Sequence, residues 1–127
     1  MLWVCLAGAI GSGTRYAVGL WAGERFGTAF PYGTLIVNVV GCFLIGVVLQ
    51  VALDHTSFPE TLRLTLATGF LGGFTTYSSF AYETLRLARF GSKAAALVNF
   101  GVTSAACFAA VVLGIGAAQL LRSAVVR

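Results

Sequence analysis

The sequence predicts an all-α membrane protein with four transmembrane helices, the third of them broken in the middle of the membrane. Of its 127 residues, 58% are hydrophobic and only 9% are charged, whereas a soluble domain carries about 25% charged residues. The charges separate four apolar stretches, each long enough to cross a membrane. We expect one transmembrane domain over residues 1–127, with spans at roughly 2–23, 32–53, 61–86 and 94–121.

The first span contains a single charge, Arg15. A cleaved signal peptide is the alternative, but the stretch has no basic amino-terminal region and Arg15 interrupts its apolar part. Trp3 and Trp21 are separated by about 27 Å along a helix, which is close to the thickness of the hydrocarbon core. Tryptophan prefers the two membrane interfaces, so this pair favours a span.

The remaining spans follow from their lack of charge and from short linkers. Residues 26–53, 64–82 and 94–121 contain no charged residue. Pro31 and Pro59 mark linkers before the second and third spans, and Gly91 marks the linker before the fourth. Connections this short make successive helices antiparallel neighbours.

The segment Gly69–Thr76 interrupts the third span. Its three glycines and two threonines make a poor helix interior. A break at this depth frees backbone carbonyls, which are tolerated only inside protein or beside a polar cavity. Freed carbonyl oxygens suit an alkali cation. A kinked helix packed through its glycines is the alternative.

Polar residues in the first two spans need an explanation because a membrane tolerates them poorly. Arg15 either extends to the interface or faces a wet vestibule where it attracts an anion. Asn38 either makes an interhelical hydrogen bond or points a donor into a pore, and Thr34 lies one turn before it on the same face.

Two further patterns lie after the break. Tyr77 and Phe80 share a helix face, so their electropositive ring edges either contact a small anion or simply pack. In the fourth span, Asn99, Thr103 and Cys107 recur every fourth residue and form one stripe. This stripe either satisfies its own backbone or lines a narrow permeation track.

The basic residues give no orientation signal. They stand singly at the ends of apolar runs, which is typical of membrane anchors and not of a nucleic-acid surface. One side of the membrane would hold Arg63, Arg122 and Arg127, and the other Arg25, Arg86, Arg89 and Lys93. Such a balance allows insertion in both orientations, which would give an antiparallel homodimer.

The sequence resembles the Fluc (CrcB) fluoride channels of bacteria over almost its whole length. The most specific part is Gly69–Phe80 followed by Glu83. The second is Gly33–Asn38 with its following glycines, and the third is Gly11–Arg15. The three motifs occur in the right order on the right spans.

This resemblance implies a channel that passively exports fluoride across the bacterial inner membrane, as a multi-pass protein, and protects the cell from fluoride. It implies a dual-topology homodimer with two pores, in which the carbonyls of Gly72 and Thr75 from both subunits hold a structural sodium ion. The expected fluoride pathway comprises Asn38, Tyr77, Ser79, Phe80, Thr103 and Cys107. The expected vestibule or structural residues are Arg15, Thr34 and Glu83.

The sequence departs from the family pattern at three of these places. Tyr77 stands where phenylalanine is usual, and Cys107 where a hydroxyl residue is often found. Asn99 stands where a tyrosine or a small polar residue is expected. These departures concern details of the polar track.

Other functions fit the sequence less well. A small proton-coupled multidrug exporter needs a carboxylate in its first span, where this chain has Arg15 and no acid. A membrane subunit without transport leaves the break unexplained. An enzyme has no support, because no nucleophile–base constellation is visible. Cys5, Cys42 and Cys107 have no metal or redox spacing and are interpreted as small buried residues.

Overall fold

The computed structural model describes residues 1–125, which are helical and contain no strand. Arg127, counted above among the basic residues, lies outside this range. Three segments are continuous helices: α1 (Leu2–Phe26), α2 (Tyr32–Asp54) and α6 (Lys93–Val125). The third span is divided into α3 (Glu60–Leu64), the π-helical η1 (Thr65–Leu71), α4 (Gly72–Phe74) and α5 (Tyr77–Phe90). Four helices with the third one broken are thus confirmed.

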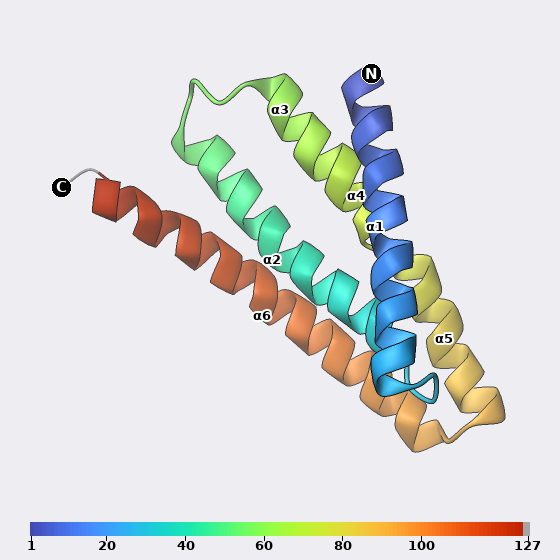
Figure 1. The fold of residues 1–127 in the computed structure, drawn as a ribbon. Helices are drawn as coiled ribbons and strands as arrows, with labels where there is room; N and C mark the ends of the chain where they lie inside the picture. The colour runs from blue at the N-terminus through green and yellow to red at the C-terminus, as the bar shows by residue number, and fades with distance from the viewer. Residues whose placement is uncertain (126–127) are drawn as a thin grey trace.

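The helices run up and down in sequence order (Figure 1). The amino terminus, the linker at residues 55–59 and the end of α6 lie at one end, and the linkers at 27–31 and 91–92 lie at the other. The bundle consists of two close pairs, because α2 packs most extensively on α6 while α1 packs on η1 and α4. The break therefore lies where the third span passes α1 and α2.

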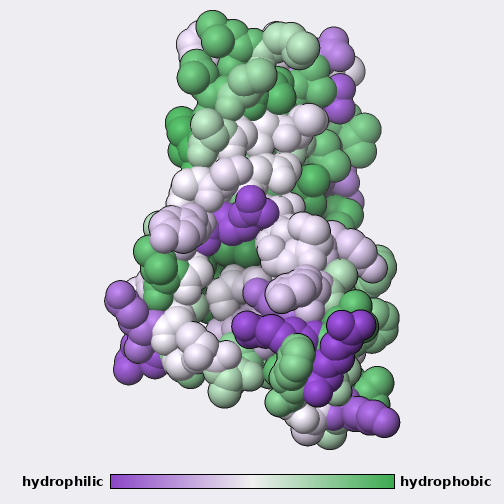
Figure 2. Space-filling model, turned by 90° about the vertical axis from the view of Figure 1, so that its right-hand side faces the viewer, coloured by the Kyte–Doolittle hydropathy of each residue, from purple (hydrophilic) through white to green (hydrophobic). Residues whose placement is uncertain are grey.

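The distribution of side chains is that of a protein dissolved in lipid. Large apolar side chains such as Phe108 and Leu97 are 77% and 72% exposed. The buried side chains include the polar Asn38, Thr76, Asn99 and Thr103. By length and hydropathy, α2 and α6 are candidate membrane spans. Figure 2 shows the α1 and α5 side, where a hollow rimmed by hydrophilic side chains lies below a mainly hydrophobic surface.

Glycines allow the helices in each pair to touch through their backbones. A Cβ atom on Gly11 would collide with the Phe70 carbonyl, and one on Gly73 with the Gly8 carbonyl, so α1 lies directly against the third span. Close contact of this kind is the usual way in which membrane helices gain packing energy. All three glycines expected to break the third span are helical. Gly69 and Gly73 serve this contact, whereas an added Cβ on Gly72 would meet no atom of α1 within 4 Å.

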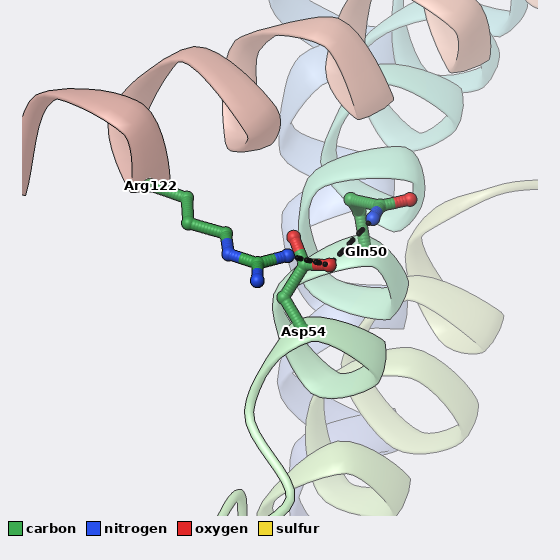
Figure 3. A network of polar contacts seen from close by, with 3 residues as sticks. All are labelled: Gln50, Asp54 and Arg122. Atoms are coloured by element: carbon green, nitrogen blue, oxygen red, sulfur yellow. Dashed lines mark hydrogen bonds and ion pairs between the residues drawn. The ribbon is translucent and has the colours of Figure 1, made fainter. Parts of the chain in front are cut away.

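Glycine also brings the backbones of α2 and α6 together. A polar network connects the two helices where α2 ends. A Cβ atom on Gly114 would collide with the Phe43 carbonyl. At the end of α2, Asp54 accepts hydrogen bonds of 3.0 Å from both Gln50 Nε2 and Arg122 Nη1 (Figure 3). Asp54 is largely buried, so this ion pair is better shielded from solvent than an ordinary surface pair.

The α2–α6 contact predicts a difference between two glycines of one helix. Gly114→Ala should destabilise the protein by about 1–3 kcal/mol, because its methyl group must displace backbone. Gly116→Ala is the matched control: no atom lies within 4 Å of its added Cβ. Thermal unfolding in detergent measures both, and equal midpoints for the two variants would contradict this packing.

Candidate functional site

The break in the third span is confined to Thr75 and Thr76. Both residues have extended backbones, with φ −84° and ψ 159° at Thr75 and φ −153° and ψ 113° at Thr76. The preceding helix ends at Phe74 and the next begins at Tyr77. The break therefore falls within the predicted segment, at its carboxyl end and on its threonines.

Asn38 of α2 pairs with the backbone of the break. The Thr76 amide donates to Asn38 Oδ1 at 2.7 Å, and Asn38 Nδ2 donates to the Thr76 carbonyl at 3.0 Å. Both residues are buried. Because a backbone amide can only donate, the carboxamide must present its oxygen to the Thr76 N–H. Asn38 therefore makes an interhelical hydrogen bond and still has one Nδ2 proton free to donate.

Thr76 also starts the next helix. Its hydroxyl accepts from the Ser79 amide at 3.2 Å and donates to Ser79 Oγ at 3.0 Å, which makes Thr76 the N-cap of α5. The expected site residues include Ser79 but not Thr76. Threonine is a preferred N-cap residue, so its place directly before the helical stretch that starts at Tyr77 is a signal that could have identified it.

These two interactions free the carbonyls of Gly72 and Thr75. In a continuous helix, these oxygens would accept from the amides four residues on, at Thr76 and Ser79. Those amides instead donate to Asn38 Oδ1 and to the Thr76 hydroxyl. Arg15 Nη1 approaches the Thr75 carbonyl at 3.4 Å. The family resemblance implied the Gly72 and Thr75 carbonyls as sodium ligands. These two carbonyls lack their helical donors because side-chain oxygens accept from the Thr76 and Ser79 amides.

A cavity of about 350 Å³ brings most of the predicted site residues together. Its lining comes from α2, the third span and α6. The predicted residues in this lining are Asn38, Gly72, Thr75, Tyr77, Phe80, Thr103 and Cys107. We call this space the inner cavity.

The other predicted residues gather around a second cavity of about 440 Å³, which we call the outer cavity. They are Arg15, Thr34, Ser79 and Glu83. Arg15 is half-buried and extends toward the break, as in the vestibule interpretation. Thr76 lines both cavities, so the break lies between them.

The two aromatic residues after the break share a face, as predicted. The ring centroids of Tyr77 and Phe80 are 5.7 Å apart, and Phe80 stacks on Phe100 of α6 at 6.0 Å. Their environments differ, because Phe80 is 5% exposed and Tyr77 is 78% exposed. The single chain thus encloses the Phe80 ring and leaves the Tyr77 ring on its surface.

The predicted polar stripe on α6 is directed into the bundle. Asn99 is 1% exposed and Thr103 is 3% exposed. Asn99 Nδ2 donates to Thr84 Oγ1 of α5 at 2.8 Å, and Thr103 Oγ1 donates to Asn99 Oδ1 at 3.3 Å. Asn99 therefore links α5 to α6, while Thr103 and Cys107 continue the stripe along the inner cavity.

The predicted burial of the cysteines is only partly correct. Cys5 is exposed on α1, whereas Cys42 and Cys107 are half-buried. Small apolar side chains can face lipid at no cost, so burial is not required of Cys5.

Comparison with known proteins identifies the family to which this chain belongs. The family model described as CrcB-like protein, Camphor Resistance (CrcB), matches residues 2–115. The chain belongs to the CrcB family. The CrcB relatives named fluoride-specific ion channel FluC include one from Acidobacterium capsulatum, 50% identical over 89% of this chain and 90% of the relative. Another, from Sorangium cellulosum, is 49% identical over 94% of each chain.

More distant CrcB relatives cover the chain equally well. The FluC protein of Citrifermentans bemidjiense is 41% identical over 95% of this chain and 98% of its own length. The family consists of membrane ion channels and not of enzymes. Membership therefore favours a channel over the multidrug exporter that the sequence left as the alternative.

Proposed function

We propose that this chain is a fluoride-selective channel that passively exports fluoride through the plasma membrane, the inner membrane of a bacterium, and so protects the cell from fluoride. The observation that carries this proposal is the inner cavity, where the polar side chains of Asn38 and Thr103 border a largely apolar space beside a broken helix, in a chain whose close relatives are named fluoride-specific ion channels. Downhill flow needs no coupled energy source.

The chemistry of the two cavities suits a small, strongly hydrated anion. Fluoride gives up hydration water only where hydrogen-bond donors replace it, and binding must stay weak enough for release. Arg15 in the outer cavity attracts the anion. In the inner cavity the donors are the second Nδ2 proton of Asn38, the edge of the Phe80 ring and the Thr103 hydroxyl, which turns from Asn99 Oδ1 to the anion.

The remaining pathway residues extend this track. Ser79 lies on the outer side of the break, and Tyr77 and Cys107 lie on the inner side. The Tyr77 hydroxyl adds a donor that phenylalanine lacks. Thr34 and Glu83 line the outer cavity together with Arg15.

We further propose that the Gly72 and Thr75 carbonyls hold a structural sodium ion, which is not transported, at the centre of an antiparallel, dual-topology homodimer with two pores. Neutral carbonyl oxygens freed from helical bonding are suitable ligands for an alkali cation. Two carbonyls supply too few ligands, so a second copy must provide the rest. Tyr77 and Gly72 are exposed beside these carbonyls, which leaves their surface open to that copy.

Fluoride efflux from liposomes containing the purified protein tests the channel proposal. Fluoride should leave without a proton gradient and far faster than chloride. Thr103→Val removes one donor to a charged ligand, so efflux should slow about tenfold, which corresponds to about 1.4 kcal/mol.

Thr14→Val is the matched control for this experiment. The Thr14 hydroxyl donates to the Ile10 carbonyl on α1 and lines neither cavity, so this variant should keep wild-type efflux. Equal efflux of fluoride and chloride, or efflux only with a proton gradient, would overturn the proposal. Equal slowing in both variants would remove Thr103 from the pathway.

Sodium removal tests the dimer centre. Replacing sodium by N-methylglucamine should slow fluoride efflux and lower the fraction of dimer measured by cross-linking in detergent, because the carbonyls of the two copies would lose their shared ligand. Terminal tags should be accessible on both faces of sealed vesicles. Unchanged efflux and dimer fraction would refute the sodium site, and tags on one face only would refute dual topology.

A further inference from the structure

Two cysteines far apart in the sequence lie next to each other in the bundle. The helices α2 and α6 run in the same direction, with Gly46 against Val111 and Asp54 against Arg122. Cys42 precedes Gly46 by one turn and Cys107 precedes Val111 by one turn, so the matching turns of the two helices carry one thiol each. Both side chains line the same cavity, and both thiols are free.

This thiol pair borders the inner cavity. Cys42 and Cys107 both line it, together with the Asn38 and Thr103 side chains. Both cysteines are half-buried, so a small reagent that enters the cavity can reach them. Cys5 is exposed on α1 and lines neither the inner nor the outer cavity, which makes it an internal reference thiol.

We propose that Cys42 and Cys107 form a binding site for a two-coordinate, thiophilic divalent cation, with mercury(II) as the matching ion, and that its occupation blocks the inner cavity. The site itself depends only on the paired thiols. The block rests on the proposed function, because it concerns fluoride movement through the same space.

The chemistry of the pair selects this class of ion. Mercury(II) forms one bond to each sulfur, both S–H bonds break, and two protons pass to solvent without oxidation or reduction. The product is neutral, which suits a cavity lined mainly by apolar groups such as Ile45, Leu71 and Phe108. A monovalent soft ion would leave a net negative charge there.

Metals with higher coordination numbers do not fit. Structural zinc sites use four ligands, and no group of three or more His, Cys, Asp or Glu side chains is gathered anywhere in residues 1–125. The neighbouring Asn38 and Thr103 offer hard nitrogen and oxygen groups that soft ions bind weakly. Two thiols on matching turns of packed helices therefore favour a linear two-coordinate ion.

The first test counts thiols on the purified protein and does not involve fluoride. One equivalent of mercury(II) chloride should bind one mercury per chain and remove two of the three titratable thiols, as read by intact mass and thiol titration. Cys5→Ala should keep this stoichiometry. Cys42→Ala and Cys107→Ala should lose one thiol per mercury and release the metal to a monothiol wash. A wild-type chain that loses only one thiol, or a Cys42→Ala chain that resists the wash, would overturn the site.

The second test measures fluoride efflux of each protein relative to its own untreated rate. One equivalent of mercury(II) should slow wild-type and Cys5→Ala efflux at least about tenfold, with recovery on adding a dithiol. Cys42→Ala should recover after the monothiol wash alone. Full occupancy by thiol count with undiminished efflux would overturn the block. Absence of fluoride efflux before treatment would instead overturn the proposed function, and the thiol count would still decide the site.

Discussion

The double hydrogen bond between the Asn38 carboxamide and the Thr76 backbone is the constraint on which the rest of the site depends. A helix cannot open inside a membrane unless its freed amides and carbonyls find partners, since each buried unpaired group costs about 1–3 kcal/mol. Asn38 supplies an acceptor and a donor at the place of opening. Without it, the Thr76 amide and carbonyl would lose their partners, and the Thr76 N–H would be open to exchange.

The same interaction connects packing to the proposed function. The Thr76 hydroxyl caps α5, which fixes where Phe80 begins its contact with α6. The released Thr75 carbonyl faces Arg15, and Thr76 itself separates the outer cavity from the inner one. One buried side chain on α2 thereby positions the freed carbonyls, the Phe80 ring and the boundary between the two cavities, which explains why so few polar residues are needed within an apolar bundle.

The helices and the polar stripe on α6 could be predicted from the sequence. Segments that lie in lipid contain few charged residues, and polar residues on one helix face recur at helical spacing. Asn99, Thr103 and Cys107 follow from that spacing alone. The exact place of the break within Gly69–Thr76 could not be predicted, because glycine is both a weak helix former and a close-packing residue. Only the contact with α1 distinguishes the two uses at Gly73. That Cys42 and Cys107 line one cavity depends on the register of α2 against α6, which no pattern within either helix encodes.

Amide hydrogen exchange at Thr76 tests the central interaction most directly. Thr76 should exchange slowly in the wild type and at least about tenfold faster in Asn38→Leu, which has a similar size but neither accepts nor donates. Gln50→Leu, the matched amide-to-leucine change on α2 away from the break, should leave Thr76 protected. Equal protection of Thr76 in the wild type and in Asn38→Leu would contradict the account.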